Sequence, residues 1–140
     1  MHQIVITKVQ EKFGFEARDE SGNIIRMDSA EESGGKNFGA RPMQLLLMGL
    51  GGCSGIDIVT ILEKQKQTIT GFQAIISGER QKDKIPSLWQ NVKITFMLKG
   101  DVEYDKAERA CRLAMEKYCS VAETLRLSGT NLTWELQLNP

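Results

Sequence analysis

The chain has 140 residues, and its 18 lysines and arginines balance 18 aspartates and glutamates. This length suits a single domain, residues 1–140, with a sizeable core. The zero net charge argues against nucleic acid as a partner, which calls for a basic excess, and against an anionic membrane surface. The N-terminus shows no charged start followed by an apolar run, so we expect no signal peptide and a cytoplasmic location.

The first forty residues predict three short strands followed by a loop. The strands are expected where β-branched or aromatic residues alternate with polar ones, at residues 3–9, 12–19 and 23–28, with a turn at Ser21-Gly22-Asn23. Residues 29–40 are polar and rich in glycine, which predicts a loop long enough to be functional.

Residues 41–64 are the longest apolar stretch and predict a long central helix that opens at Pro42. Apolar residues cover nearly its whole circumference, which predicts a buried helix. A membrane span is disfavoured because Asp57 interrupts a run that is otherwise too short for the ~20 residues a bilayer requires. Gly51 and Gly55 share one face, which predicts close packing, such as helix on helix across a dimer axis; room for a reactant beside Cys53 is the functional alternative.

The rest of the chain predicts two strands, two helices and a last strand. Periodicity places them at residues 71–81, 90–98, 105–117, 120–127 and 130–138. Gly100 is expected to stop the second of these strands, and Ser120 with Glu123 predicts a capping box at the second helix. The order βββ-α-ββ-α-α-β predicts an α+β fold with a largely antiparallel sheet.

The three cysteines and the single histidine limit the kinds of catalytic or metal site that the chain can form. No CxxC occurs, so we expect no zinc site, and His2 near the terminus is a poor base for a Cys-His or Ser-His-Asp enzyme. Cys119 precedes a predicted helix N-terminus, which favours a thiolate, although a boundary residue packed on the core fits equally well. Cys111, in the middle of a helix, is expected to be structural.

The segment GLGGCSG predicts no nucleotide site. It lacks the lysine of a phosphate loop, and the third glycine of a dinucleotide motif falls on Ser54. Cys53 in this segment is, taken alone, more often a buried structural cysteine than a nucleophile. It lies about three turns into its helix, beyond the reach of the helix dipole, so a thiolate there needs a cation. The candidates are Arg18, Arg26, Arg41 and Arg80, which the sequence does not rank.

Three segments together resemble the OsmC/Ohr family of bacterial thiol peroxidases: PMQLLLMGLGGCSGIDIVTIL, GERQKDKIPSLWQNVKITF and MEKYCSVAETL. The resemblance covers roughly Arg18 to Leu138 and is greatest to an OsmC-like subgroup with PMELLL…GGC and KYCSV patterns. It implies an intertwined homodimer with largely antiparallel sheets wrapped around the long central helices, and a peroxidatic cysteine at Cys53 with a resolving cysteine at Cys119.

The same resemblance implies an arginine and a glutamate that hold the reactive thiolate. The glutamate of well-studied members follows the proline, where this chain has Met43 instead. The arginine falls on Arg18, Arg26 or Arg41, without a firm alignment. Because Met43 stands where the family has its glutamate, the arginine–glutamate pair that holds the thiolate in the family is incomplete at this position.

Two functional hypotheses follow. The first is a cofactor-free peroxidase of organic hydroperoxides, in which Cys53 becomes a sulfenic acid, Cys119 condenses with it, and a dithiol or lipoyl-type reductant restores both thiols. The second is a non-catalytic or redox-sensing protein that binds a small apolar ligand at the dimer interface, which Met43 in place of the acid favours. No metal and no cofactor is expected in either case.

Overall fold

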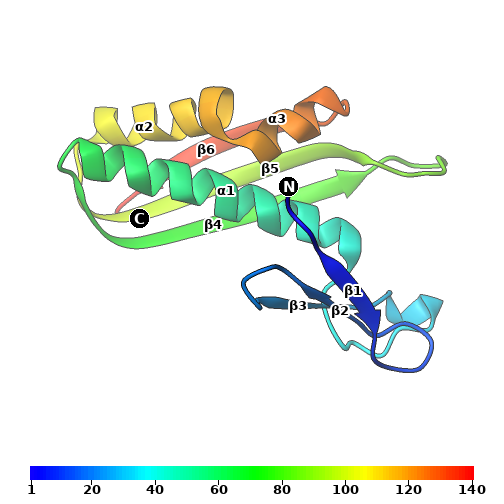
Figure 1. Ribbon diagram of the computed structural model, residues 1–140. Coiled ribbons are helices and arrows are strands. Elements are labelled where there is room, and N and C mark those ends of the chain that lie inside the picture. The colour runs from blue at the N-terminus through cyan, green and yellow to red at the C-terminus, as the bar shows by residue number, and fades with distance from the viewer. The chain divides into compact units, whose positions relative to one another are not determined.

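In the computed structural model, which describes residues 1–140, the chain separates into an N-terminal unit, Met1–Leu46, and a C-terminal unit, Leu47–Pro140 (Figure 1). The order of strands and α-helices is the predicted βββ-α-ββ-α-α-β, with short additional helical segments at Glu31–Ser33 and Ala114–Tyr118. The α+β class is therefore confirmed. That all 140 residues fold as one domain stays a prediction.

Three short antiparallel strands form the sheet of the N-terminal unit. They are β1 (Val5–Lys8), β2 (Phe15–Arg18) and β3 (Ile24–Met27), paired in sequence order. The predicted turn between β2 and β3 is present: the carboxylate of Asp19 accepts the backbone N–H groups of Ser21 and Asn23, each at 2.9 Å. All three strands were predicted, and each is shorter than its alternating segment.

The loop of residues 29–40, which includes the 3-10 helix η1 (Glu31–Ser33), is organised around a buried carboxylate. Asp28 accepts backbone N–H groups from Lys36 at 2.9 Å, Phe38 at 3.2 Å and Ser29 at 2.7 Å. These hydrogen bonds, that of Lys36 first, hold the pKa of Asp28 below its ordinary value. The loop is therefore held in place by its own backbone donors around one charge.

Helix α1 (Pro42–Lys64) begins at Pro42 as predicted, and from Leu47 onward it packs along β4 (Thr68–Arg80). A Cβ added at Gly51 would lie 2.9 Å from Cδ1 of Ile76, and one added at Gly55 would lie 3.1 Å from the Phe72 ring. The close packing predicted from these glycines is thus present. Its partner within this chain is a strand rather than a second helix.

The sheet of the C-terminal unit consists of β4, β5 (Trp89–Asp101) and β6 (Asn131–Leu138). β4 and β5 are antiparallel, but β6 runs parallel to β5, because the helices between them form a crossover connection. The prediction of a largely antiparallel arrangement is confirmed, and β5–β6 is the one parallel pair. The predicted stop at Gly100 is wrong: β5 continues through it at a φ of 140°, which glycine tolerates.

The second helical region follows β5 and ends at Cys119. Helix α2 (Tyr104–Leu113) continues into a wider π-helical turn, η2 (Ala114–Tyr118), where the sequence predicts regular helix to residue 117. Helix α3 (Ser120–Leu127) then begins, and its N-cap is Cys119 rather than Ser120, so the predicted capping box is wrong. Figure 1 shows α1, α2 and α3 on one face of the β4-β5-β6 sheet.

The core of the C-terminal unit lies between these helices and the sheet. Its fully buried apolar residues come from every layer: Leu50, Ile58 and Leu62 of α1; Val92, Ile94, Phe96 and Leu98 of β5; and Ala107, Ala110 and Met115 of α2 and η2. The alternation of β5 is what brings its four residues to this one face.

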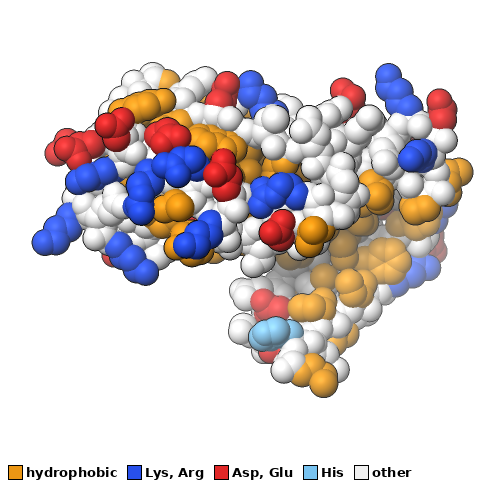
Figure 2. Space-filling model, turned by 90° about the horizontal axis from the view of Figure 1, so that it is seen from above, with side chains coloured by type: hydrophobic (Ala, Val, Ile, Leu, Met, Phe, Trp, Pro, Cys, Tyr) orange, Lys and Arg blue, Asp and Glu red, His pale blue; other side chains and the backbone are white.

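The outward face of α1 is exposed in this chain, so the prediction of complete burial is wrong there. Met48 is 55% exposed, Ile56 70% and Val59 39%, and a Cβ at Gly52 would meet no atom within 4 Å. By length and composition alone α1 could cross a membrane, a test that core helices of soluble proteins also pass. Figure 2 shows hydrophobic side chains reaching the surface among charged ones.

Candidate active site

Two cysteines and one aspartate, far apart in sequence, meet inside the C-terminal unit. Cys53 and Asp57 are one turn apart on α1 and therefore share a face, and Cys119 stands at the junction of η2 and α3. The two Sγ atoms and a carboxylate oxygen of Asp57 all lie within 4.8 Å of one another. Both cysteines are reduced, and the Cys53 thiol is one of the groups that raise the pKa of Cys119.

Cys119 is the buried member of the pair, with 2% of its surface exposed. Burial is the main cause that raises the pKa of its thiol to about 11, and the neighbouring Cys53 thiol adds to this effect. The N–H of Ala122 donates a hydrogen bond to Sγ at 3.3 Å and lowers the pKa of the thiol, but this effect is smaller than that of burial. The expectation that the helix N-terminus favours a thiolate here is therefore wrong, because desolvation outweighs the backbone donors.

Asp57 has neither a cation nor a hydrogen-bond donor to offset its charge. Its Oδ2 is buried without a hydrogen-bond partner, and burial raises the pKa of the carboxyl. From the sequence, Asp57 is assigned no role at this site and serves only to disfavour a membrane span. A signal was available: an acid four residues after Cys53 on an apolar helix must share the face of that cysteine.

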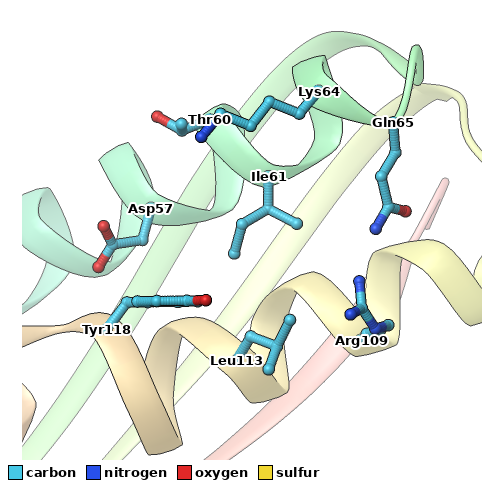
Figure 3. Close-up of a pocket in the computed structure, with 8 residues that line it drawn as sticks. All are labelled: Asp57, Thr60, Ile61, Lys64, Gln65, Arg109, Leu113 and Tyr118. Carbon is cyan, nitrogen blue, oxygen red and sulfur yellow. The ribbon is translucent and has the colours of Figure 1, made fainter.

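A cavity of about 400 Å³ adjoins this cluster, between α1 and the α2–η2 segment (Figure 3). Asp57 and Tyr118 lie at one end, Gln65 and Arg109 at the other, and the apolar Ile61 between them. The full lining is Asp57, Thr60, Ile61, Lys64, Gln65, Arg109, Leu113 and Tyr118. Asp57 belongs to both the cavity and the sulfur cluster, whereas neither cysteine lines the cavity.

The three groups of the cluster lie close enough together to hold a metal ion between them. Cysteine and aspartate are suitable donors, but a closed structural zinc site takes four protein ligands. We assign no metal to this cluster.

Three of the four candidate arginines, Arg18, Arg26 and Arg41, lie in the N-terminal unit, whereas Cys53 and the fourth candidate, Arg80, lie in the C-terminal unit. Arg18 on β2 and Arg26 on β3 both pair with Glu16, at 3.5 and 3.4 Å, so an arginine–glutamate group is present away from the position of Met43. Arg41 is exposed immediately before α1. Which of the three arginines activates Cys53 stays a prediction.

Arg80 and Cys111 have structural roles and lie outside the candidate site. The guanidinium of Arg80 donates to the backbone carbonyl of Ser87 at 2.8 and 3.2 Å, which fixes the β4–β5 connection. Cys111 is completely buried on α2, where burial raises the pKa of its thiol to about 12. It is not part of the sulfur cluster.

Known proteins resemble this chain over most of its length. Residues 33–135 match the family described as OsmC-like protein. Protein YhfA of Escherichia coli K12 is 38% identical over 114 residues, which cover 81% of each chain. The structure of a hypothetical protein from Aquifex aeolicus VF5 aligns with a TM-score of 0.81 at 28% identity, covering 100% of this chain and 98% of that one. An organic hydroperoxide resistance protein from Legionella pneumophila shares the fold, with a TM-score of 0.71 at 15% identity and coverage of 98% and 96%.

Proposed function

Because this chain belongs to the OsmC-like family, we propose that it is a cysteine-based peroxidase that reduces organic hydroperoxides in the defence against oxidative stress. The observation that carries the proposal is the closeness of the thiols of Cys53 and Cys119, whose Sγ atoms come from different elements and lie within 4.8 Å of each other. The name of the Legionella pneumophila neighbour, an organic hydroperoxide resistance protein, supports the same chemistry.

In this mechanism the Cys53 thiolate attacks the terminal oxygen of the hydroperoxide, and the O–O bond breaks to release an alkoxide. The sulfur becomes a sulfenic acid. Cys119 then attacks that sulfur, so a disulfide forms and the hydroxyl group leaves as water with the proton of the Cys119 thiol. The sulfurs start within 4.8 Å of each other, so a small movement brings them to the ~2 Å of a disulfide. A dithiol or lipoyl-type reductant then restores both thiols by exchange, without a cofactor.

The proposal includes a homodimer in the cytoplasm, where thiols are kept reduced. The exposed stripe on α1, formed by Met48, Gly52, Ile56 and Val59, is spaced as one helical face and would be covered by a second copy of the chain. One of Arg18, Arg26 and Arg41 would supply the cation that stabilises the Cys53 thiolate.

A second candidate function is a non-catalytic or redox-sensing protein that binds a small apolar ligand. Met43 in place of the family glutamate favours this reading. So does a mostly apolar cavity of about 260 Å³ in the N-terminal unit, lined by Ile6, Phe13, Phe15, Met27, Asp28, Ser29 and Pro42. A ligand bound there would require no chemistry at Cys53.

Turnover with cumene hydroperoxide and a dithiol reductant distinguishes the two functions. We expect the parent chain to consume the hydroperoxide, Cys53→Ser to consume none, and Cys111→Ser to retain the parental rate. A parent chain that leaves the hydroperoxide unchanged, or a Cys53→Ser variant that still consumes it, would reject the peroxidase and favour the binding protein.

A further inference from the structure

Asp57 is the acidic group nearest to both sulfurs, and nothing in the chain neutralises it. Its carboxylate has no ion pair, and Oδ2 is buried without a hydrogen-bond donor. Leaving a buried acceptor unsatisfied is normally destabilising, so a carboxylate in this position calls for an explanation. Burial raises the pKa of this carboxyl above its ordinary value, so it takes up a proton more readily than a free aspartate does.

We propose that Asp57 is the proton-transfer group of the Cys53–Cys119 pair, which gives a proton to the leaving oxygen and takes one from the Cys119 thiol. This inference rests on the proposed function for its first step only. The second step, removal of the Cys119 proton, is required by any reaction that joins the two sulfurs.

The first step needs an acid. When the Cys53 thiolate displaces RO⁻ from the hydroperoxide, the protonated carboxyl of Asp57 supplies the proton that makes ROH. Cys53 is then a sulfenic acid and Asp57 a carboxylate. A general acid contributes most when its pKa lies near the working pH, and burial moves that of Asp57 upward in this direction.

The second step needs a base. The Cys119 thiol, with a pKa of about 11, is protonated at neutral pH and reacts poorly with a sulfenic acid in that form. The Asp57 carboxylate takes this proton as Cys119 attacks Cys53 and then passes it to the departing hydroxide, which leaves as water. One proton from solvent resets Asp57, so the sum is Cys53 thiolate, Cys119 thiol, hydroperoxide and one proton giving disulfide, alcohol and water.

The groups around Asp57 are compatible with this role. Cys53 faces it from α1 and Cys119 from the start of α3. Through the adjoining cavity, Lys64 of α1, Arg109 of α2 and Tyr118 of η2 also line its surroundings, and none of them forms an ion pair with it. The cavity thus gives solvent access to the carboxyl group of Asp57.

Thiol–disulfide exchange with 5,5′-dithiobis(2-nitrobenzoate) tests the inference without peroxide. Cys53 displaces one thionitrobenzoate, and the attack of Cys119 on the mixed disulfide releases a second. In the parent we expect a fast second release with shallow pH dependence. In Asp57→Asn we expect it to be about 100-fold slower, and to rise about tenfold per pH unit between pH 7 and 9, since only hydroxide then removes the Cys119 proton. Asp57→Glu should recover part of the rate.

Glu63→Gln is the matched control, because it removes the same charge from an exposed position of the same helix and should leave the second release unchanged. A second release in Asp57→Asn within threefold of the parent, at the parental pH dependence, would overturn the inference. The inference would also be overturned if the purified chain held one zinc ion at the cluster of Cys53, Asp57 and Cys119, with both thiols unavailable for exchange. If the parent shows the Asp57-dependent release but no hydroperoxide consumption, the proposed function fails and the inference stands.

Discussion

The thiol of Cys119 caps helix α3 by accepting the backbone N–H of Ala122 at 3.3 Å. The same sulfur lies within 4.8 Å of the Sγ atom of Cys53. One atom therefore has two tasks: it satisfies a helix terminus in the reduced chain and, in the proposed reaction, forms a disulfide. Disulfide formation requires a change at the start of α3, because the sulfur must move toward Cys53.

The capping role predicts that the two conservative replacements of Cys119 differ in stability. Serine at an N-cap accepts the same N–H group, so Cys119→Ser should remain near the parent. Cys119→Ala leaves the donor of Ala122 without this acceptor and should lower the free energy of unfolding by about 1 kcal/mol relative to the serine variant. Urea unfolding of the reduced proteins measures the difference. Equal stability of both variants would show that the sulfur does not stabilise the helix.

Asp57→Asn should raise the melting temperature at neutral pH. Burial raises the folded-state pKa of Asp57 above the ordinary 3.8, so the proton binds more tightly to the folded chain. The stabilisation that comes from this proton is fully present at pH values below the pKa of Asp57 in the unfolded chain. It is lost as the pH rises through the pKa of Asp57 in the folded chain. The advantage of the asparagine variant at pH 7 should therefore shrink as the pH falls toward 4. Glu63→Gln should show no such convergence, and an Asp57→Asn variant that melts below the parent at pH 7 would contradict the prediction.

Asp28→Asn should loosen the loop of residues 29–40. The pKa of Asp28 is lowered by its backbone donors, so its stabilising contribution is present above the ordinary value of 3.8 and lost as pH falls through the depressed folded value. At neutral pH the amide accepts more weakly than the carboxylate, and the N–H groups of Lys36 and Phe38 should exchange faster with deuterium. Asp19→Asn, which weakens the β2–β3 turn instead, is the control, and unchanged exchange at both amides in Asp28→Asn would refute this account.

Ile56→Glu should dissociate the proposed homodimer. Ile56 is 70% exposed at the centre of the apolar stripe on α1, and a second copy of the chain would bury a charge there. Light scattering at micromolar concentration should give the dimer mass for the parent and the monomer mass for the variant. Leu127→Glu, on the exposed end of α3, should remain a dimer. A parent chain of monomer mass would rule out the assembly.

Cys111 should remain a thiol while the other two cysteines are oxidised. It is completely buried, and with a pKa of about 12 its thiolate fraction at pH 7 is about 10⁻⁵. After one equivalent of cumene hydroperoxide, non-reducing peptide mapping should find Cys53 joined to Cys119 and Cys111 free. Cys111→Ala should consume the hydroperoxide at the parental rate. A disulfide that includes Cys111 would contradict the mechanism.

The sequence by itself determined the elements and the family. Alternation located all six strands because side chains of a strand point to opposite faces, as the buried Val92, Ile94, Phe96 and Leu98 of β5 show. Pro42 fixed the start of α1, and the glycines at 51 and 55 predicted a close approach. The motifs around Cys53 and Cys119 indicated the family, because they combine residue types and spacings over most of the chain.

Only the tertiary structure decided what surrounds each of these groups. The direction of β6, the exposure of Ile56 and the strand that packs against Gly51 depend on which elements lie side by side, which local periodicity does not encode. The same holds for protonation: Cys119 lies at a helix N-terminus in the sequence, but its burial against Cys53 sets its pKa. Asp57 is an ordinary acid on an apolar helix until the fold brings the Cys119 sulfur beside it and buries one of its carboxylate oxygens without a hydrogen-bond donor.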